Sequence, residues 1–310
     1  MTKQINVAVT HSSVFHADDV IAAAILRGIN PQVRFVRSRR EQDWSAADVV
    51  FDVGGRHDPE AGVFDHHQRE RAGARGNGVL FSSAGLLWRH FGLVYLEAVA
   101  GGAGVDLAEL HDRVDEVLIM AIDAVDNGQT VEPPTTLRDR PDTAVRVQDL
   151  SNVFSVLNPV GLFEADTEEA FNEAFEVAVG FAGLVLRKIT LREAATLRAR
   201  DEIRAADTGE PILVMERFYP WQEVVCGEMP HVHFVVFPSP DGSWKVQVVP
   251  QEIGQFAARK DLPEVWKGLR DAELAAVTGV ADAIFCHPGR FIAGARSREG
   301  ALALARLAVA

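Results

Sequence analysis

Residues 48–70, "DVVFDVGGRHDPEAGVFDHHQRE", hold two short apolar runs, and each run ends in side chains able to bind a metal. The first run ends at Asp52, and the second ends at Asp65, His66 and His67. Burying such groups without partners would be costly, so something at the ends of these runs must compensate for the loss of water. The stretch therefore predicts two strands whose ends meet in one polar site.

The segments on either side alternate between strand and helix patterns. Residues 5–11 and 33–38 are predicted strands, residues 47–55 form a third and more buried strand, and residues 18–29 form an Ala-rich helix. Such alternation is typical of the α/β class, in which a parallel sheet has helices on both faces and ligands collect at the carboxyl ends of the strands. Further helices are predicted over residues 82–92 and 115–128.

The length of 310 residues favours about two domains of roughly 150 residues each. A long helical pattern from about Thr167 to Ala206 predicts a helix that bridges them, and "DTGEP" (207–211) marks the boundary. Residues 231–250 then predict a hairpin around a Pro-Asp-Gly turn, and residues 299–310 a closing helix. The expected organisation is a larger α/β domain followed by a smaller C-terminal α+β domain. Their predicted bounds are residues 1–206 and 207–310.

Composition narrows the classes of function. The formal net charge is −13, which argues against binding to long duplex DNA, because that binding depends on neutralising many phosphates. No apolar run approaches the roughly 18 residues that a membrane helix needs, and no secretory leader is visible. The two cysteines, Cys226 and Cys286, form no metal-binding or redox motif. We therefore expect a cytoplasmic protein that is not embedded in a membrane.

Groups able to bind a metal gather in five places in the first half of the chain. Taken alone, each has an ordinary explanation, such as a helix cap for Asp18 or Asp19 and a turn for Asp126. Four of the five places nevertheless lie where a predicted strand ends or has just ended, which favours one shared site. The five places are His11; His16 with Asp18 and Asp19; Asp52; Asp65 with His66 and His67; and Asp123 with Asp126.

This mixture of imidazole and carboxylate groups suits Mn²⁺, Fe²⁺, Co²⁺ or Zn²⁺ better than the all-oxygen sites of Mg²⁺ and Ca²⁺. The number of candidate ligands leaves a two-metal site open, in which Asp52 would bridge two ions roughly 3.5–4 Å apart. A water between the ions would lose its proton near neutral pH and act as the nucleophile. A covalent nucleophile is not indicated, because the chain has no "GxSxG" motif and no cysteine near a candidate base.

The chain also resembles the melanocyte-proliferating-gene-one (Myg) family, which is related to the DHH phosphoesterases. The resemblance rests on residues 48–70 together with "VTHSSVFHADDVIAA" (9–23), "AIDAVDNG" (121–128) and "LPEVWKGLRD" (262–271), and it covers nearly the whole chain. It implies a DHH-like domain that binds two divalent ions, joined to a smaller domain that closes over the substrate. Members related to this family are described as 3′→5′ exonucleases that act on RNA.

Carried over residue by residue, the resemblance implies a role for each matching position. Asp65 would orient His66, and His67 would face the scissile phosphate. The implied metal ligands are His11, His16, Asp18, Asp52, His66 and Asp126, with Asp123 as the alternative to Asp126. In the C-terminal domain, the implied phosphate-binding residues are Arg259, Lys260, Arg270 and His287.

One departure concerns the family's glycine-rich stretch, which reads "RFIAG" here, with Arg290 and Ala293 in place of glycines. Those glycines would let the backbone approach a phosphate closely, so their replacement bears on substrate size or binding geometry. Arg290 would itself be a further contact to the substrate phosphate.

The leading interpretation is a divalent-metal-dependent phosphodiesterase, a 3′→5′ exonuclease that shortens RNA or other single-stranded nucleic acid. The acidic composition favours short substrates, because a long single strand would need a basic groove. Mn²⁺ is the first candidate for the two ions, ahead of Mg²⁺, Co²⁺ and Zn²⁺. Two alternatives stay open: a phosphoesterase for a small nucleotide or phosphoanhydride (cyclic dinucleotide, nucleoside bisphosphate or pyrophosphate), and a non-catalytic metal- or nucleotide-binding module. Assembly into a homo-oligomer is open as well.

Overall fold

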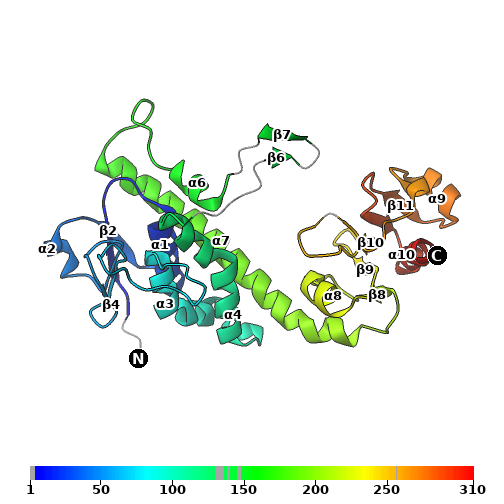
Figure 1. Cartoon of the computed structure of the whole chain (residues 1–310), viewed down its shortest axis with the longest axis horizontal. Coiled ribbons are helices and arrows are strands. Elements are labelled where there is room, and N and C mark those ends of the chain that lie inside the picture. The colour runs from blue at the N-terminus through cyan, green and yellow to red at the C-terminus, as the bar shows by residue number, and fades with distance from the viewer. Residues whose placement is uncertain (1–3, 130–135, 138–139, 145–147, 256) are drawn as a thin grey trace. The chain divides into compact units, whose positions relative to one another are not determined.

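The computed structural model describes the chain in five stretches, residues 4–129, 136–137, 140–144, 148–255 and 257–310. The chain divides into two compact units, Met1–Ala194 and Ala195–Ala310. The division falls inside one long helix, α7 (Glu168–Ala205), drawn in green in Figure 1. The predicted long helix is thus confirmed, and the domain bounds of residues 1–206 and 207–310 stay a prediction.

The first unit is built on a five-stranded sheet with the order β2-β1-β3-β5-β4. Its strands are β1 (Val7–Thr10), β2 (Arg34–Arg37), β3 (Val49–Phe51), β4 (His57–Asp58) and β5 (Val63–Phe64). Strands β2, β1, β3 and β5 run parallel, and the short β4 pairs antiparallel with β5 at one edge. This sheet confirms the predicted α/β class.

The first unit has helices where the sequence predicts them, over residues 18–29, 82–92 and 115–128, and further helices elsewhere in the described residues. Helix α4 (Leu107–Val114) continues through a π-helical turn (Asp115–Ile119) into α5 (Met120–Asp126), and such turns are frequent at functional sites. In the described part of the chain, no single helix is long and apolar enough to cross a bilayer, although the bent pair Ser83–Ala103 and Leu107–Asp126 meets the length and composition requirement when taken together. The other described helices that lie wholly in this unit are α1 (Ala17–Ile29), α2 (Glu41–Trp44), α3 (Ser83–Ala100) and α6 (Leu150–Ser155).

Helical segments pack against both faces of the first sheet. Adjacent residues of a strand point to opposite faces, so Phe35 and Val9 illustrate the two sides. On one face, the Phe35 ring lies edge-on to Phe175 of α7, with ring centroids 6.0 Å apart. On the other face, Val9 and Val50 belong to a small apolar cluster against which Trp44 of α2 packs. Helix α7 therefore packs on one side of the sheet and the short α2 on the other.

The second unit is an α+β structure around a five-stranded sheet with the order β11-β12-β10-β9-β8. The predicted hairpin is confirmed as β9 (Phe234–Pro238) and β10 (Trp244–Val248), which pair antiparallel around a turn where Gly242 has φ of 81°. The other elements are β8 (Ile212–Val214), α8 (Gln222–Glu228), α9 (Asp271–Thr278), β11 (Ala283–Cys286), β12 (Ile292–Ala295) and α10 (Arg298–Val309).

Both faces of this second sheet are buried, and β9 shows how. Phe234 and Val236 belong to a core that includes Leu304 of α10. Val235, between them in sequence, belongs to the opposite core with Ile203 near the end of α7. Because both sets of side chains are buried, β9 is apolar throughout and lacks the alternation of a half-exposed strand.

Candidate metal centre

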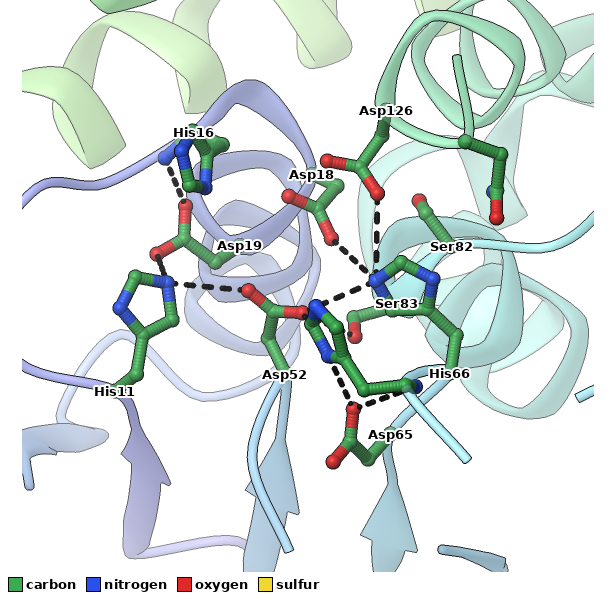
Figure 2. Close-up of polar contacts among 12 residues, drawn as sticks. His11, His16, Asp18, Asp19, Asp52, Asp65, His66, Ser82, Ser83 and Asp126 are labelled. Carbon is green, nitrogen blue, oxygen red and sulfur yellow. Dashed lines mark hydrogen bonds and ion pairs between the residues drawn. The ribbon is translucent and has the colours of Figure 1, made fainter. Parts of the chain in front are cut away.

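Three neighbouring strands of the first sheet end in side chains that the sequence singles out. His11 follows β1, Asp52 follows β3 and Asp65 follows β5, in each case as the residue directly after the strand. Since β1, β3 and β5 are adjacent and parallel, their carboxyl ends lie together at one edge of the sheet. Figure 2 shows these side chains in one polar cluster, which the N-terminus of α1 and the end of α5 complete.

Asp52 lies at the centre of this cluster, with a histidine on each side. Its Oδ2 lies 3.1 Å from His11 Nε2, its Oδ1 lies 3.3 Å from His66 Nε2, and Ser83 Oγ donates to Oδ1 at 3.1 Å. Its φ of 55° is a left-handed conformation that is strained for a non-glycine residue and recurs at functional sites. Burial alone would raise the pKa of Asp52, but His11 and His66 hold it well below its usual range. Asp52 is therefore an anion between two imidazoles.

The N-terminus of α1 supplies further groups. His16 is the N-cap residue, and its backbone N–H donates to Asp19 Oδ1 at 2.9 Å, as in a capping box. Asp19 Oδ2 lies 3.2 Å from His11 Nε2, so Asp19 both caps the helix and orients His11. Asp18 instead points toward His66, with Oδ2 3.8 Å from His66 Nε2. Asp126 reaches the same nitrogen from α5 at 3.3 Å.

The cluster holds buried negative charge that its neighbours do not fully balance. Asp18 is completely buried, and within the described residues neither of its carboxylate oxygens has a hydrogen-bond partner. Burial raises the pKa of Asp18 well above its usual value, and the anions of Asp52 and Asp126 raise it further. Buried charges in proteins are normally paired or bound to metals, so this wall of the cluster is suited to a cation.

The surroundings of His11 also favour a positive charge. Burial alone would lower its pKa, but hydrogen bonds to Asp19 and Asp52 raise it to about 10. A proton on His11 is therefore strongly favoured between these two carboxylates. A metal ion bound by neutral His11 would supply the positive charge in place of that proton.

Three overlapping sets of side chains are able to hold metal ions. In each set the ligand atoms lie within 4.8 Å of one another, and Asp52 belongs to two of the sets. The mixture of imidazole and carboxylate ligands, together with the unpartnered oxygens of Asp18, fits a divalent transition metal. The sets are His11, His16 and Asp52; Asp52, His66 and His67; and His16, Asp18 and Asp126.

Asp65 contacts His67 and not His66, which corrects one prediction. Its Oδ1 lies 2.8 Å from His67 Nδ1, and its Oδ2 accepts the Gly55 N–H at 2.6 Å. Alternate residues of an extended chain project to the same side, which brings residue 65 beside residue 67. Burial alone would raise the pKa of Asp65, but the bonds from His67 and Gly55 lower it. The bond to Asp65 in turn raises the pKa of His67.

Asp123 lies apart from the cluster and has a structural role. Its Oδ1 accepts the N–H groups of Ser82 at 3.1 Å and Gly85 at 2.9 Å, and its Oδ2 pairs with Arg75 Nη1 at 2.7 Å. A Cβ at Gly85 would lie 1.9 Å from Asp123 Oδ2, so this close approach requires glycine. Of the two alternative ligands, the structure therefore favours Asp126, whose carboxylate faces His66.

Asp19 and Ser83 contribute to the site although neither is among the implied ligands. The signal for Asp19 is its position three residues after His16, where a capping carboxylate is expected. For Ser83 no local signal exists, because its bond to Asp52 spans 31 residues of sequence. Ser83 in the first turn of α3 looks like an ordinary helix start.

The cluster opens into two pockets of the first unit. The larger pocket has a volume of about 580 Å³, and the smaller one of about 220 Å³. Asp52 and His67 line both of them. Arg71 and Ser151 line the larger pocket, whereas Arg39 lines the smaller one. Each pocket thus offers one arginine for a phosphate beside the candidate metal ligands.

Two of the predicted phosphate-binding residues hold backbone carbonyl groups in the second unit. The Arg259 guanidinium donates to the carbonyls of Met229, Val232 and Cys226 at 2.6–2.9 Å. Lys260 Nζ donates to the carbonyl of Val309 at 2.5 Å, at the end of α10. The bonds of Arg259 correct the prediction that it binds substrate, because carbonyls near the end of α8 occupy both of its terminal nitrogens. Lys260 keeps further N–H donors, so its binding to substrate stays a prediction.

The other three predicted phosphate-binding residues differ in exposure and partners. Arg290 Nε lies 2.9 Å from Glu264 and its Nη2 3.1 Å from Asp261, so its charge is balanced locally. Its φ of 56° is the left-handed conformation that favours glycine, which agrees with the glycine that the family resemblance implies at this position. Arg270 and His287 are exposed, and their binding to phosphate stays a prediction.

The role of Arg259 can be tested by its effect on stability. We expect Arg259→Met to lower the free energy of unfolding by about 2–4 kcal/mol, because several part-buried carbonyls lose a charged donor. Arg270→Met, a matched change at an exposed arginine, is expected to leave thermal unfolding unchanged. Equal melting temperatures for both variants would show that Arg259 does not stabilise the second unit.

Comparison with known proteins gives the family. The family model MYG1_exonuc, described as "Uncharacterised protein family (UPF0160)", matches residues 7–309. The chain belongs to this family. The match begins at β1 and ends in α10, so it includes every residue of the candidate metal centre. The resemblance to the Myg family is therefore confirmed.

Relatives in this family match at similar identity over nearly their whole lengths. MYG1 protein YER156C of Saccharomyces cerevisiae is 34% identical over 339 residues, which cover 100% of this chain and 96% of the yeast protein. MYG1 exonuclease of Homo sapiens is 33% identical over 329 residues, which cover 97% of this chain and 85% of the human protein. A solved pGpG-specific phosphodiesterase from Vibrio aligns over 94% of this chain and 92% of its own, but a TM-score of 0.33 and 12% identity are too low to show a shared fold.

Proposed function

We propose that this protein is a divalent-metal-dependent phosphodiesterase that removes nucleotides from the 3′ end of short RNA or other short single-stranded nucleic acid. The observation that carries the proposal is the position of Asp52, an anion that lies between His11 and His66 and belongs to two candidate ligand sets. A carboxylate so placed suits the position between two ions in nucleases and phosphatases. The relative named MYG1 exonuclease supports the same class of reaction.

Both sides of Asp52 offer ligands for an ion. When bound, two divalent ions would lower the pKa of a shared water to near neutrality and polarise the phosphate of the substrate. Mn²⁺ is our first candidate, ahead of Mg²⁺, Co²⁺ and Zn²⁺, because histidines are present on both sides. The proposed ligands are His11, His16 and Asp52 on one side, and Asp52, His66, Asp18 and Asp126 on the other.

His67 is the proposed contact to the scissile phosphate. Its side chain is 62% exposed and lines both pockets, while Asp65 holds its Nδ1 at 2.8 Å. That bond fixes the ring and leaves Nε2 for a phosphate oxygen or for the leaving oxygen of the substrate. Asp65 would therefore act as a positioning residue that also stabilises the protonated form of His67.

The pockets support a substrate of limited size. The larger pocket, with a volume of about 580 Å³, lies within the range that holds one small ligand, and Arg71 and Ser151 offer donors to its phosphate. A net charge of −13 opposes the approach of a long polyanion. These observations favour a short oligonucleotide over a long polymer.

The direction of digestion can be read from one RNA pentamer sequence prepared with the label at its 5′ end or at its 3′ end. With Mn²⁺ added to metal-stripped protein, we expect the 5′-labelled pentamer to give a ladder of products, each one nucleotide shorter. The 3′-labelled pentamer should release its label as a mononucleotide at the earliest times. Early release of a 5′-labelled mononucleotide would overturn the proposed direction.

A small nucleotide is the second candidate substrate, and the size of the larger pocket is the observation that favours it. An exonuclease should cleave a pentamer and a dinucleotide at comparable rates per end. An enzyme for small phosphoesters should cleave only the dinucleotide, or a phosphoanhydride such as pyrophosphate. Comparing these rates at equal Mn²⁺ concentration decides between the two substrates.

A further inference from the structure

The middle of α7 is apolar on its solvent side as well as on its core side. Val177, Phe181 and Leu184 are 65%, 39% and 55% exposed, respectively, and one edge of the Phe181 contact surface is taken by Phe154 of α6, with ring centroids 5.8 Å apart. With Gly180, the three exposed residues follow the i, i+3, i+4, i+7 spacing of one helix face. We call these four residues the α7 seam. A surface helix normally presents polar residues to water, so the α7 seam has the character of a face that another element covers.

Gly180 is the position in the α7 seam where a facing helix could approach α7 most closely. A Cβ at Gly180 would meet nothing within 4 Å in this chain, so internal packing does not require a glycine here. Glycine inside a helix is destabilising relative to alanine, so its presence needs another reason. A glycine beside the ring of Phe181 leaves a hole of the kind that receives a side chain from a facing helix.

The α7 seam complements itself when the helix direction is reversed. In two antiparallel copies with an axis midway between Gly180 and Phe181, each Gly180 faces Phe181 of the partner subunit. In the same register, each Val177 faces Leu184 of the partner subunit. Large side chains then lie opposite the glycine hole and opposite one another, as packed helices require.

The charges at the two ends of the α7 seam obey the same symmetry. Glu173 lies four residues before Val177, and Lys188 lies four residues after Leu184. Both side chains belong to exposed residues. In the antiparallel register, each Glu173 faces Lys188 of the partner subunit, whereas a parallel pairing would place like charges together. The charge pattern therefore specifies the antiparallel arrangement.

We propose that the α7 seam is the interface of a homodimer, in which two copies of α7 pack antiparallel about a two-fold axis between Gly180 and Phe181. A two-fold dimer uses the same patch twice, so the Glu173–Lys188 pair forms twice in each dimer. A seam of this length is a small interface, so we expect the dimer to be weak and to dissociate on dilution. The occupant of the seam is a second copy of this chain.

Sedimentation velocity on the full chain tests the interface, at protein concentrations from about 1 to about 300 µM. Leu184→Glu is expected to weaken association by about a hundredfold, because it places a charge in the apolar seam. The matched control is Leu93→Glu, since Leu93 is 51% exposed on α3, in the same unit. The control should associate like the unmodified chain. A monomer at every concentration, or equal association of the two variants, would overturn the proposal.

Charge reversal tests the register. Glu173→Lys alone and Lys188→Glu alone should each weaken the dimer by about tenfold, because each creates two like-charge contacts. The double variant, with both reversals, should recover the dissociation constant of the unmodified chain, since the opposite charges face each other again. If the double variant associates as weakly as the single variants, the antiparallel register about Gly180 and Phe181 is overturned.

Discussion

Asp52→Asn is expected to reduce Mn²⁺-dependent hydrolysis of a short oligonucleotide by about a thousandfold or more. The change keeps the shape of the side chain but removes the charge that lies between His11 and His66. An amide also cannot bridge two ions as a carboxylate does. Initial rates at saturating Mn²⁺ measure the effect, and atomic emission on the dialysed protein measures the bound metal, which we expect to fall in parallel.

The control for this variant is Asp112→Asn. Asp112 lies on α4 with its side chain 81% exposed, so the same chemical change there should alter neither metal content nor rate. Comparable thermal unfolding of both variants would show that lost activity does not reflect lost folding. If Asp52→Asn retained more than about a tenth of the rate, Asp52 would not be the central ligand of the reaction.

Asp18→Asn is expected to stabilise the metal-free protein and to reduce the stabilisation that Mn²⁺ provides. Without metal, the buried carboxylate of Asp18 faces the anions of Asp52 and Asp126, and neutralising it should raise the melting temperature by several degrees, on the order of 5 °C. With Mn²⁺ present, the variant lacks one metal ligand. The metal should therefore raise its melting temperature far less than it raises that of the unmodified chain. Thermal unfolding with and without Mn²⁺ measures both effects.

The dependence on pH provides an internal control for this prediction. The pKa of Asp18 is raised in the folded protein, so folding favours its protonated form, and the ionised group destabilises the metal-free protein above that pKa. As the pH falls, Asp18 takes up a proton. The difference in melting temperature between metal-free Asp18→Asn and the metal-free unmodified chain should therefore shrink. A variant that is less stable than the unmodified chain without metal would show that Asp18 is a structural acceptor and not an unbalanced anion.

The location of the candidate metal centre follows from local patterns in the chain. Short apolar runs separated by helical segments specify parallel strands, and parallel strands place their carboxyl ends on one edge. His11, Asp52 and Asp65 each come directly after such a run. Their meeting is thus a consequence of strand order and needs no knowledge of side-chain packing. The hairpin at Gly242 is equally local, because its turn residues specify the bend.

The partner of each polar group was decided by the tertiary structure. Asp123 and Asp126 lie on the same helix, yet only the fold brings Arg75 and Ser82 to the first and His66 to the second. A guanidinium has the same donors for a phosphate as for a carbonyl, so the sequence around Arg259 does not tell which acceptor it meets. The physical reason is that partners distant in sequence meet only after the chain has packed, whereas strand ends and turns are set by neighbouring residues.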